Sequence, residues 1–340
     1  MRKVGVLGAG SWGVALAKVL TDNGHQVTVW SVDAHEIDML TECREQKDKL
    51  PGVILPEGTA FTTDIAGAVQ GNDLLILAVP SVFTRSTAQK MAPYVRQDQV
   101  IVCVAKGIEN DTLMTLTQVV EQEIPQAVTA VMSGPSHAEE VGIGLPTTVV
   151  AGAQSRRIAE LVQDTFMNEY FRVYTSPDTL GMELGGSIKN VIALAAGMSD
   201  GLGYGDNTRA ALITRGIAEI ARLGTAMGAN IATLSGLTGI GDLIVTCGSM
   251  HSRNRRAGIL MGQGYTMEEA TREVKMVVEG VHSAKAAKAL ADRYEVSMPI
   301  VEEVNKVLFE GASVKDAVRD LMLRDKRKES SGLQWDEEQG

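Results

Sequence analysis

The chain has 340 residues, of which 44% are apolar and 22% charged, and its formal net charge is −10. This length favours two domains, and the composition is that of a globular protein with a large core. The acidic balance argues against a general surface for nucleic acid or anionic membranes, so any anion site must be a local basic cluster. No uncharged apolar window reaches the ~18 residues of a membrane span, and we expect neither a nucleic-acid partner nor membrane insertion.

The number and spacing of the cysteines and histidines favour neither disulfide bonds nor a metal site. Cys43, Cys103 and Cys247 are odd in number and far apart, with no C-x-x-C pair. This usage is typical of a reduced, cytoplasmic protein. The five histidines show no metal-ligand spacing, so we expect no bound metal.

The first half of the chain alternates short β-branched runs with helical patterns, which predicts a doubly wound parallel sheet. The continuous apolar run from Leu74 to Val79 is typical of a parallel strand that is buried on both faces. Strands are expected at Lys3–Leu7, Gln26–Trp30, Asp73–Val79, Gln99–Ala105, Ala127–Met132 and Thr147–Ala151. Helices are expected at Ser11–Asn23, Val82–Tyr94, Leu113–Glu123 and Ser155–Met167.

A glycine pattern directly after the first strand indicates a dinucleotide site. Gly8-Ala9-Gly10-Ser11-Trp12-Gly13 fits G-x-G-x-x-G and opens a helix. Gly8 allows the tight turn, Gly10 lets the backbone approach a pyrophosphate, and Gly13 permits close packing of helix on strand. The helix N-terminus suits the anion. The alternative is a bare glycine turn, which this strand-turn-helix context disfavours.

The residues after the second strand bear on the choice between NADH and NADPH. An acid there suits the ribose hydroxyls of NAD, whereas an arginine suits the 2′-phosphate of NADP. Asp33 is present and no basic residue adjoins it, which favours NAD. Arg44 or Lys47 could fold back toward the site, so both cofactors stay open.

Three later strand ends point to the same crevice, because ligands of such sheets bind at the carboxyl edge. These ends are Pro80-Ser81, Lys106-Gly107 and Ser133-Gly134-Pro135-Ser136. Lys106 can offer a cation to a carbonyl or phosphate oxygen. A solvated charge at a strand end is the alternative interpretation.

The second half of the chain is rich in helices and glycine. Helical patterns cover Met182–Gly201, Thr208–Met227, Thr266–Glu273, Ser283–Arg293 and Val301–Leu308, with a glycine-rich stretch at Ser235–Gly248. The turn signal at Ser176-Pro177-Asp178 predicts a boundary, giving a dinucleotide-binding Rossmann domain at 1–177 and a helical substrate domain at 178–325. Residues 326–340 are expected to form a polar, loosely ordered tail.

Lys189 is a charged residue in a predicted helix that is apolar on every side. Such a helix is buried, and desolvation of an ammonium group lowers its pKa toward the range of proton exchange near neutrality. A structural ion pair is the competing interpretation. Asp242, in the otherwise apolar run Gly236–Asp242, is the natural partner of this lysine.

The segment Ser252-Arg253-Asn254-Arg255-Arg256 precedes a short helical pattern. Serine, asparagine and arginine donors at a helix start suit a phosphate group. A solvated basic loop is the alternative, but the acidic charge of the whole chain makes such a cluster less expected by chance.

Eight segments taken together resemble one family, the bacterial-type NAD(P)-dependent glycerol-3-phosphate dehydrogenases. In chain order they are GAGSWG from Gly8, VPS at Val79–Ser81, AKGIE at Ala105–Glu109, SGPSHAEEV at Ser133–Val141, GGSIKNVIALAAG at Gly185–Gly197, GLTGIGDLIVTC at Gly236–Cys247, SRNRR at Ser252–Arg256 and VVEGV at Val277–Val281. The family often has histidine or arginine where this chain has Val32, which weighs against a preference for NADP.

This resemblance implies a Rossmann domain followed by an all-α domain like that of 6-phosphogluconate dehydrogenase. It implies reversible hydride transfer between NADH or NADPH and dihydroxyacetone phosphate, giving sn-glycerol 3-phosphate for glycerophospholipid synthesis. Lys189 would donate and accept the proton beside Asp242. Implied substrate contacts are Lys106, Gly134, Ser136, Lys189, Asp242, Ser252, Arg253 and Asn254, and implied cofactor contacts beyond the glycines are Ser11, Trp12, Lys106, Ala138, Arg253, Val277 and Glu279.

Two rival functions stay open at this point. One is a dehydrogenase of similar architecture that acts on a β-hydroxy acid or on ketopantoate, because an arginine would also hold a carboxylate. The other is a regulator that binds a dinucleotide without turnover, although Lys189 beside Asn190, with Asp242 downstream, is more than a sensor requires. Glycine-rich apolar helices in the second domain make a homodimer plausible.

Overall fold

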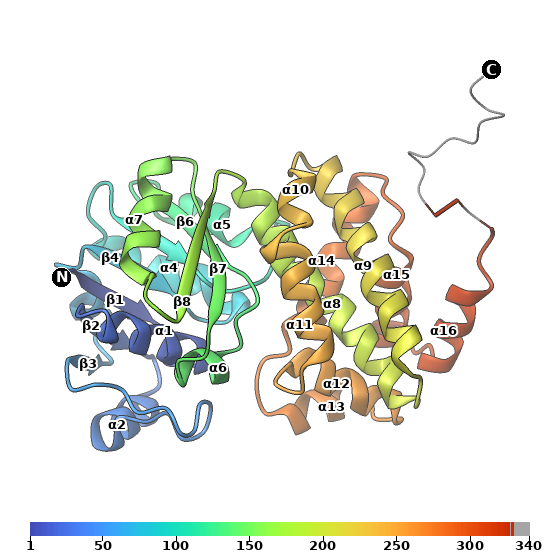
Figure 1. Cartoon of the computed structure of the whole chain (residues 1–340), viewed down its shortest axis with the longest axis horizontal. Coiled ribbons are helices and arrows are strands. Elements are labelled where there is room, and N and C mark those ends of the chain that lie inside the picture. Colours follow the sequence, from blue (N-terminus) through green and yellow to red (C-terminus); the bar gives the residue numbers. More distant parts are fainter. Residues whose placement is uncertain (327, 330–340) are drawn as a thin grey trace.

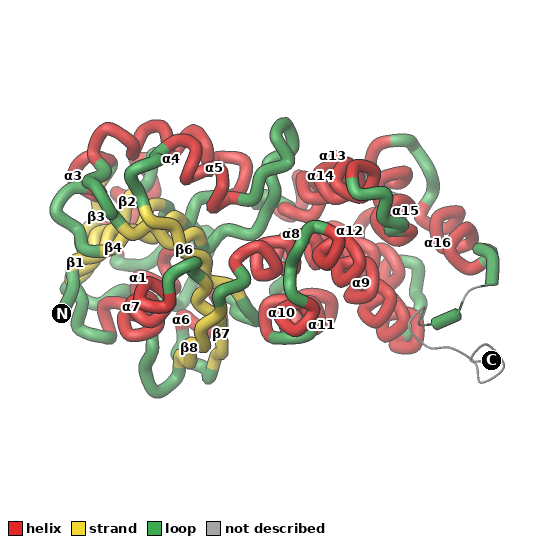
Figure 2. Tube along the Cα trace, turned by 90° about the horizontal axis from the view of Figure 1, so that it is seen from above, coloured by secondary structure: helices red, strands yellow, loops and turns green. Residues whose placement is uncertain are grey.

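The computed structural model describes residues 1–326, 328 and 329, which form a sheet domain and a helical domain side by side (Figure 1). The strands occupy one half of the molecule, and the other half contains helices and loops alone (Figure 2). The chain passes from the last strand to the first long helix between Ser176 and Thr179, and we propose the domain boundary there. The tail expected at 326–340 lies largely outside the described residues.

The first domain is an eight-stranded sheet with the strand order β3-β2-β1-β4-β5-β6-β7-β8. The strands are β1 (Lys3–Leu7), β2 (Gln26–Trp30), β3 (Thr59–Thr62), β4 (Leu74–Leu77), β5 (Val100–Cys103), β6 (Val128–Ser133), β7 (Thr147–Gly152) and β8 (Phe171–Ser176). The helices are α1 (Ser11–Asp22), α2 (Ala34–Cys43), α3 (Ile65–Val69), α4 (Thr84–Met91), α5 (Leu116–Glu123), α6 (Ala138–Gly142) and α7 (Arg156–Phe166). This arrangement confirms the predicted doubly wound sheet.

Burial of the sheet on both faces explains its apolar central strands. Side chains of a strand alternate between the two faces. In β4, Leu74 and Ile76 belong to one buried cluster, and Leu75 and Leu77 belong to another on the opposite face. Both faces of β4 therefore pack against apolar side chains, as its sequence predicts.

The sheet departs from the predictions at its edges. β7 pairs antiparallel with β6, so β7 and β8 run against the other strands and the sheet is not wholly parallel. Within the sheet domain the predictions also missed β3, β8, α2, α3 and α6. β8 alternates buried and exposed side chains near its start because it lies at the edge of the sheet, and this pattern is weaker than a continuous apolar run.

The second domain is built around α8 (Thr179–Gly201), which is buried along almost its whole length. The other helices are α9 (Asp206–Ala226), α10 (Ile231–Leu234), α11 (Asp242–Gly248), α12 (Arg253–Gly262), α13 (Met267–Val274), α14 (Glu279–Arg293), α15 (Pro299–Phe309) and α16 (Val314–Met322). A helix that is apolar all round is stable only when other helices cover it. This requirement places α8 in the centre of the domain.

The glycine-rich stretch after α10 folds as a π-helical turn, Leu237–Gly241, that leads directly into α11. The window Ile231–Gly248 is long and apolar enough to pass for a membrane span by composition alone, with a mean hydropathy of 1.4. In the structure it is interrupted at Ser235 and Gly236, and the charged Asp242 lies within it. The segment packs against α8 as part of the domain core.

Close packing of α8 on α12 depends on a glycine. A Cβ atom at Gly197 would lie 2.1 Å from the carbonyl oxygen of Arg255, which is backbone and cannot move independently of α12. No side chain larger than hydrogen fits at this crossing without separating the two helices.

We therefore expect Gly197→Ala to lower the free energy of unfolding by about 1–3 kcal/mol, despite the higher helix propensity of alanine, because the helices must move apart. Urea unfolding followed by circular dichroism measures this. Gly248→Ala, at the end of α11 with no atom within 4 Å of the added Cβ, is the matched control and should be near neutral. Equal effects at both positions would contradict the packing argument.

Candidate active site

A cavity of about 1080 Å³ opens at the carboxyl edge of the sheet and is lined by residues of both domains. The sheet domain contributes the turn after β1 and the strand ends at Val79 and Lys106. The helical domain contributes Lys189, Asp242 and the start of α12. The structure thus brings together the separate segments that the sequence analysis singled out.

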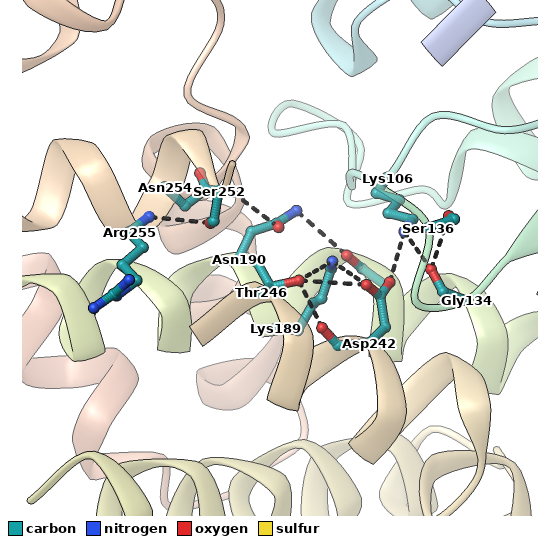
Figure 3. Close-up of polar contacts among 11 residues, drawn as sticks. Lys106, Gly134, Ser136, Lys189, Asn190, Asp242, Thr246, Ser252, Asn254 and Arg255 are labelled. Carbon is teal, nitrogen blue, oxygen red and sulfur yellow. Dashed lines mark hydrogen bonds and ion pairs between the residues drawn. The ribbon is translucent and has the colours of Figure 1, made fainter. Parts of the chain in front are cut away.

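Three charged groups meet at the centre of this cavity (Figure 3). The Lys189 ammonium donates to one carboxylate oxygen of Asp242 and, over 2.5 Å, to the Thr246 hydroxyl. The Lys106 ammonium donates to the other Asp242 oxygen at 2.6 Å and to the Gly134 carbonyl at 3.0 Å. Lys189 and Asp242 are 4% and 1% exposed, so the predicted burial of this pair is confirmed. One buried carboxylate therefore serves two lysines.

This arrangement moves the pKa values of the lysine and the carboxylate. Burial is the largest influence on Lys189 and lowers its pKa to about 8, with the charge of Lys106 adding to the effect and Asp242 opposing it. Burial alone would raise the pKa of Asp242, but the Lys106 and Lys189 ammonium groups outweigh it and hold that pKa below its usual value. Near neutral pH the carboxylate stays ionised while Lys189 can exchange a proton.

Local structure explains how Asp242 and Thr246 converge on Lys189. Asp242 opens α11 and Thr246 follows four residues later, so both side chains lie on the same helix face. The Thr246 hydroxyl donates to the Asp242 carbonyl at 2.6 Å, which fixes the rotamer of the threonine. The π-helical turn before Asp242 turns this face toward α8, and such turns are frequent at functional sites.

The glycine turn after β1 has the shape that a pyrophosphate requires. Gly8 has a φ of +130°, and a Cβ at Gly13 would lie 2.0 Å from the Gly8 carbonyl oxygen. A Cβ at Gly10 would meet no atom within 4 Å, and Gly10 precedes α1 without a side-chain cap. The first amides of α1, at Ser11 and Trp12, adjoin the cavity. The residues present fit the diphosphate of a dinucleotide at a helix N-terminus.

The basic run Ser252–Arg256, which was predicted to bind a phosphate, lies partly in the cavity lining and partly outside it. Ser252 caps α12 by accepting from the Arg255 amide at 3.2 Å, and Arg253 lines the cavity while donating to the Val277 carbonyl at 3.2 Å. Asn254 donates to Asn190 at 2.9 Å. Arg255 instead pairs with Asp200 at 2.8 Å, away from the cavity lining. Only the first part of the basic run contributes to the site.

The remaining predicted cofactor contacts also border the cavity. Glu279 accepts from the Ser81 amide at 3.0 Å and from the Ser81 hydroxyl, and this contact joins the two domains. Ala138 begins α6 and is buried, and the Ser136 hydroxyl donates to the Gly134 carbonyl at 3.0 Å. Val277 lines the cavity next to Arg253.

Carboxylates surround the end of β2. Asp33 caps α2 by accepting from the His35 amide at 3.0 Å, and the buried Glu36 accepts from the Ser31 hydroxyl at 2.5 Å and pairs with Lys49. Val32 lies between these residues and is 72% exposed.

The two basic residues that could have folded back toward this site do not line the cavity. Arg44 donates to the carbonyls of Leu55 and Thr59, and Lys47 donates to the Cys43 sulfur.

Comparison with known proteins agrees with this geometry. Models of the N-terminal and C-terminal domains of NAD-dependent glycerol-3-phosphate dehydrogenase match residues 3–159 and 178–319. The chain belongs to this family.

Two relatives and one crystal structure illustrate how much of the chain is shared. A glycerol-3-phosphate dehydrogenase (NAD(P)+) of Agathobacter rectalis is 69% identical over 98% of this chain and 100% of its own length. The corresponding enzyme of Bacillus subtilis is 54% identical over 98% of the chain and 97% of its own length. The crystal structure of glycerol-3-phosphate dehydrogenase from Coxiella burnetii superposes with a TM-score of 0.92 at 36% identity, covering 95% of this chain and 99% of that one. This chain is therefore an oxidoreductase that uses a nicotinamide cofactor.

Sequence reasoning assigned no role to Thr246 and His137, and it predicted no contact for Asn190. Thr246 and Asn190 hold Lys189 and Asn254 in place, and their spacing from Asp242 and Lys189 is the signal that could have found them. His137 lies beside the charged cluster, where burial and the charge of Lys189 lower its pKa, and its Nε2 atom has no partner among the described residues. His137 lies within the segment SGPSHAEEV that carries the family resemblance, but that resemblance gave it no role.

We expect Asp242→Asn to lower the free energy of unfolding at pH 7 by about 3–5 kcal/mol, because the buried lysines lose their counter-charge. Urea unfolding of this variant and of Asp242→Asn/Lys189→Met measures the effect. The double variant should recover part of the loss, since it removes one uncompensated charge. No recovery would show that the two ammonium groups do not depend on this carboxylate.

Proposed function

We propose that the protein reduces dihydroxyacetone phosphate reversibly to sn-glycerol 3-phosphate with NADH or NADPH, for glycerophospholipid synthesis. The observation that carries this proposal is the buried Lys189, which shares Asp242 with Lys106 at the floor of a cavity that also contains the glycine turn and the start of α12. A ketopantoate-type or β-hydroxyacid dehydrogenase, or a regulator without turnover, is not favoured by the family to which the chain belongs.

The charged cluster supports acid-base catalysis at a carbonyl group. A bound nicotinamide cofactor supplies the hydride, and negative charge then develops on the carbonyl oxygen of the substrate. Lys189 donates a proton to that oxygen, and its lowered pKa makes the transfer favourable near neutral pH. Asp242 orients Lys189, while Lys106 adds a second positive charge near the same oxygen. In the reverse direction Lys189 accepts the proton.

The start of α12 supports binding of the substrate phosphate at a distance from the reacting carbon. Ser252, Arg253 and Asn254 present hydroxyl, guanidinium and amide groups at a helix N-terminus, and Ser136 lines the cavity on the opposite domain, where the Gly134 carbonyl behind it accepts from Lys106 and Ser136. Binding energy from this remote group orients the carbonyl toward Lys189.

The cofactor extends along the carboxyl edge of the sheet in this proposal. The turn at Gly8, Gly10, Ser11, Trp12 and Gly13 would hold its diphosphate, and Lys106, Ala138, Arg253, Val277 and Glu279 would border its nicotinamide end. One cavity is lined by all of these residues except Gly13, which supports this path.

The carboxylates at the end of β2 favour NADH over NADPH. The 2′-phosphate of NADPH would lie near Asp33 and Glu36, and Lys49 is already paired with Glu36. We also propose that the protein is a cytoplasmic homodimer, as its cysteine usage and the apolar helices of the second domain suggest.

The substrate assignment is tested with purified protein and two ketones. We expect oxidation of NADH or NADPH with dihydroxyacetone phosphate and little activity with dihydroxyacetone. Arg253→Gln should raise the KM for the phosphorylated ketone roughly tenfold to a hundredfold, because a hydrogen bond to a charged group is lost. Arg157→Gln, an exposed position on α7, is the control. Comparable rates with both ketones would contradict a phosphate site at α12.

The role of Lys189 is tested by substitution and by pH. Lys189→Met should lower kcat by about 10²–10⁴-fold with near-normal cofactor binding, whereas Lys288→Met on the surface of α14 should change neither. Because only protonated Lys189 donates, ketone reduction should decline as pH rises through about 8, and glycerol 3-phosphate oxidation should increase. A pH profile of reduction that stays flat across this range would remove Lys189 from proton transfer.

Cofactor choice is tested by the ratio of kcat/KM for NADH and NADPH. Repulsion of the 2′-phosphate by the carboxylates should favour NADH by about tenfold or more, since 1.4 kcal/mol corresponds to tenfold. Val32→Arg should raise kcat/KM for NADPH, and Val32→Leu should leave the ratio unchanged. A wild-type preference for NADPH would overturn this part of the proposal.

A further inference from the structure

A second cavity, of about 470 Å³, lies in the helical domain between α8, α9, α15 and α16. Among the residues that the structure describes, it shares no lining residue with the active-site cavity. Apolar side chains form most of its walls, among them Leu212, Val304, Val307 and Leu321. Its volume falls within the roughly 300–1,000 Å³ of pockets that take ligands.

Two buried oxygens in the lining of this cavity have no hydrogen-bond partner among the described residues. They are the Ser199 hydroxyl, in a residue 1% exposed, and the Oε2 atom of Glu303, in a residue 9% exposed. The other oxygen of Glu303 accepts from Lys306 at 2.7 Å. Buried polar atoms are rarely left unpaired. The occupant that fits is an apolar group carrying a hydrogen-bond donor for Glu303.

The described part of the chain ends at this same cavity. Lys328 and Glu329 line it, and Arg215 of α9 donates to the Glu329 carbonyl at 3.4 Å. Exposed basic side chains of Arg215, Arg222 and Arg324 also belong to the lining. Glu329 is the one exposed acidic residue of the described lining, and Glu219 and Glu303 are buried within it, so the entrance carries an excess of positive charge although the whole protein is acidic.

We propose that the C-terminal segment Ser330–Gly340, which lies outside the described residues, binds in this cavity with Trp335 in its apolar interior. Indole combines a large apolar surface with a single N–H donor, which matches apolar walls that contain an unpaired carboxylate oxygen. The segment contains no basic residue, and Asp336-Glu337-Glu338 complements the basic entrance.

The length of the segment allows this binding. Five residues separate Glu329 from Trp335, and the six Cα–Cα steps between them can span about 20 Å when extended. Because the segment is attached at the cavity, its effective concentration there is high, which favours binding within one chain over binding to a second copy. The sequence alone predicts a loosely ordered tail, whereas the cavity offers a site for its one aromatic residue.

Tryptophan fluorescence of the full-length protein tests the proposal. The other tryptophans, Trp12 and Trp30, lie in the sheet domain, so the difference between the wild type and Trp335→Phe isolates the signal of Trp335. We expect this signal to be blue-shifted and protected from acrylamide, independently of protein concentration. Arg215→Glu should reduce the protection through charge repulsion, and Arg157→Glu in the sheet domain is the matched control.

Truncation after Glu329 provides a second test, in which no side chain of the cavity wall is substituted. The truncated chain should bind anilinonaphthalenesulfonate and show a Tm lowered by roughly 2–4 °C, while kcat stays unchanged. A Trp335 signal that matches a free tryptophan amide in the wild type would overturn the proposal. Protection that disappears on dilution would overturn it in favour of the segment of a second copy.

Discussion

The Asp242 carboxylate is the interaction on which the rest of the site depends. It balances two ammonium groups that come from different domains, Lys106 from the end of β5 and Lys189 from the centre of α8. Because Lys189 and Asp242 are buried and Lys106 is partly buried, the carboxylate offsets much of the cost of placing two positive charges here. These three groups sum to one positive charge when both lysines are protonated. This excess charge suits an oxygen atom on which negative charge develops.

The helical domain positions this cluster through a sequence of close contacts. α8 is apolar on all sides and must lie in the centre, so Lys189 is buried by the fold rather than by local sequence. The close approach of α12 to α8 at Gly197 places the start of α12 beside the part of α8 that contains Lys189. There Asn254 bonds to Asn190, the neighbour of Lys189, and to the Gly280 amide at 2.8 Å. The donors proposed to bind the phosphate and the lysine proposed to transfer the proton are thus held by one pair of helices.

The charged residues that stand in otherwise apolar stretches of the sequence were the easiest part of this protein to predict. A lysine in an apolar helix and an aspartate in a glycine-rich run predicted a buried pair, and the structure contains it. The sequence could not predict which arginine of the basic run lines the cavity, because Arg253 and Arg255 are chemically alike. Two residues that are two positions apart in a helix point about 200° apart, so Arg253 faces the cavity and Arg255 faces Asp200. β3 and β8 were missed because strands at the sheet edges lack a continuous apolar run.

The difference between the two titrating partners explains how a single lysine can serve both directions of a reaction. Lys106 and Lys189 hold the pKa of Asp242 low, so the carboxylate keeps its charge and does not compete for the proton. Burial brings the pKa of Lys189 to about 8, so both of its protonation states are populated near physiological pH. When the environment moves the pKa values of two neighbouring groups apart, the two groups can take different roles in proton transfer. In the proposed reaction the carboxylate would orient Lys189, the lysine would transfer the proton, and the charge of Lys106 would help to keep Asp242 ionised.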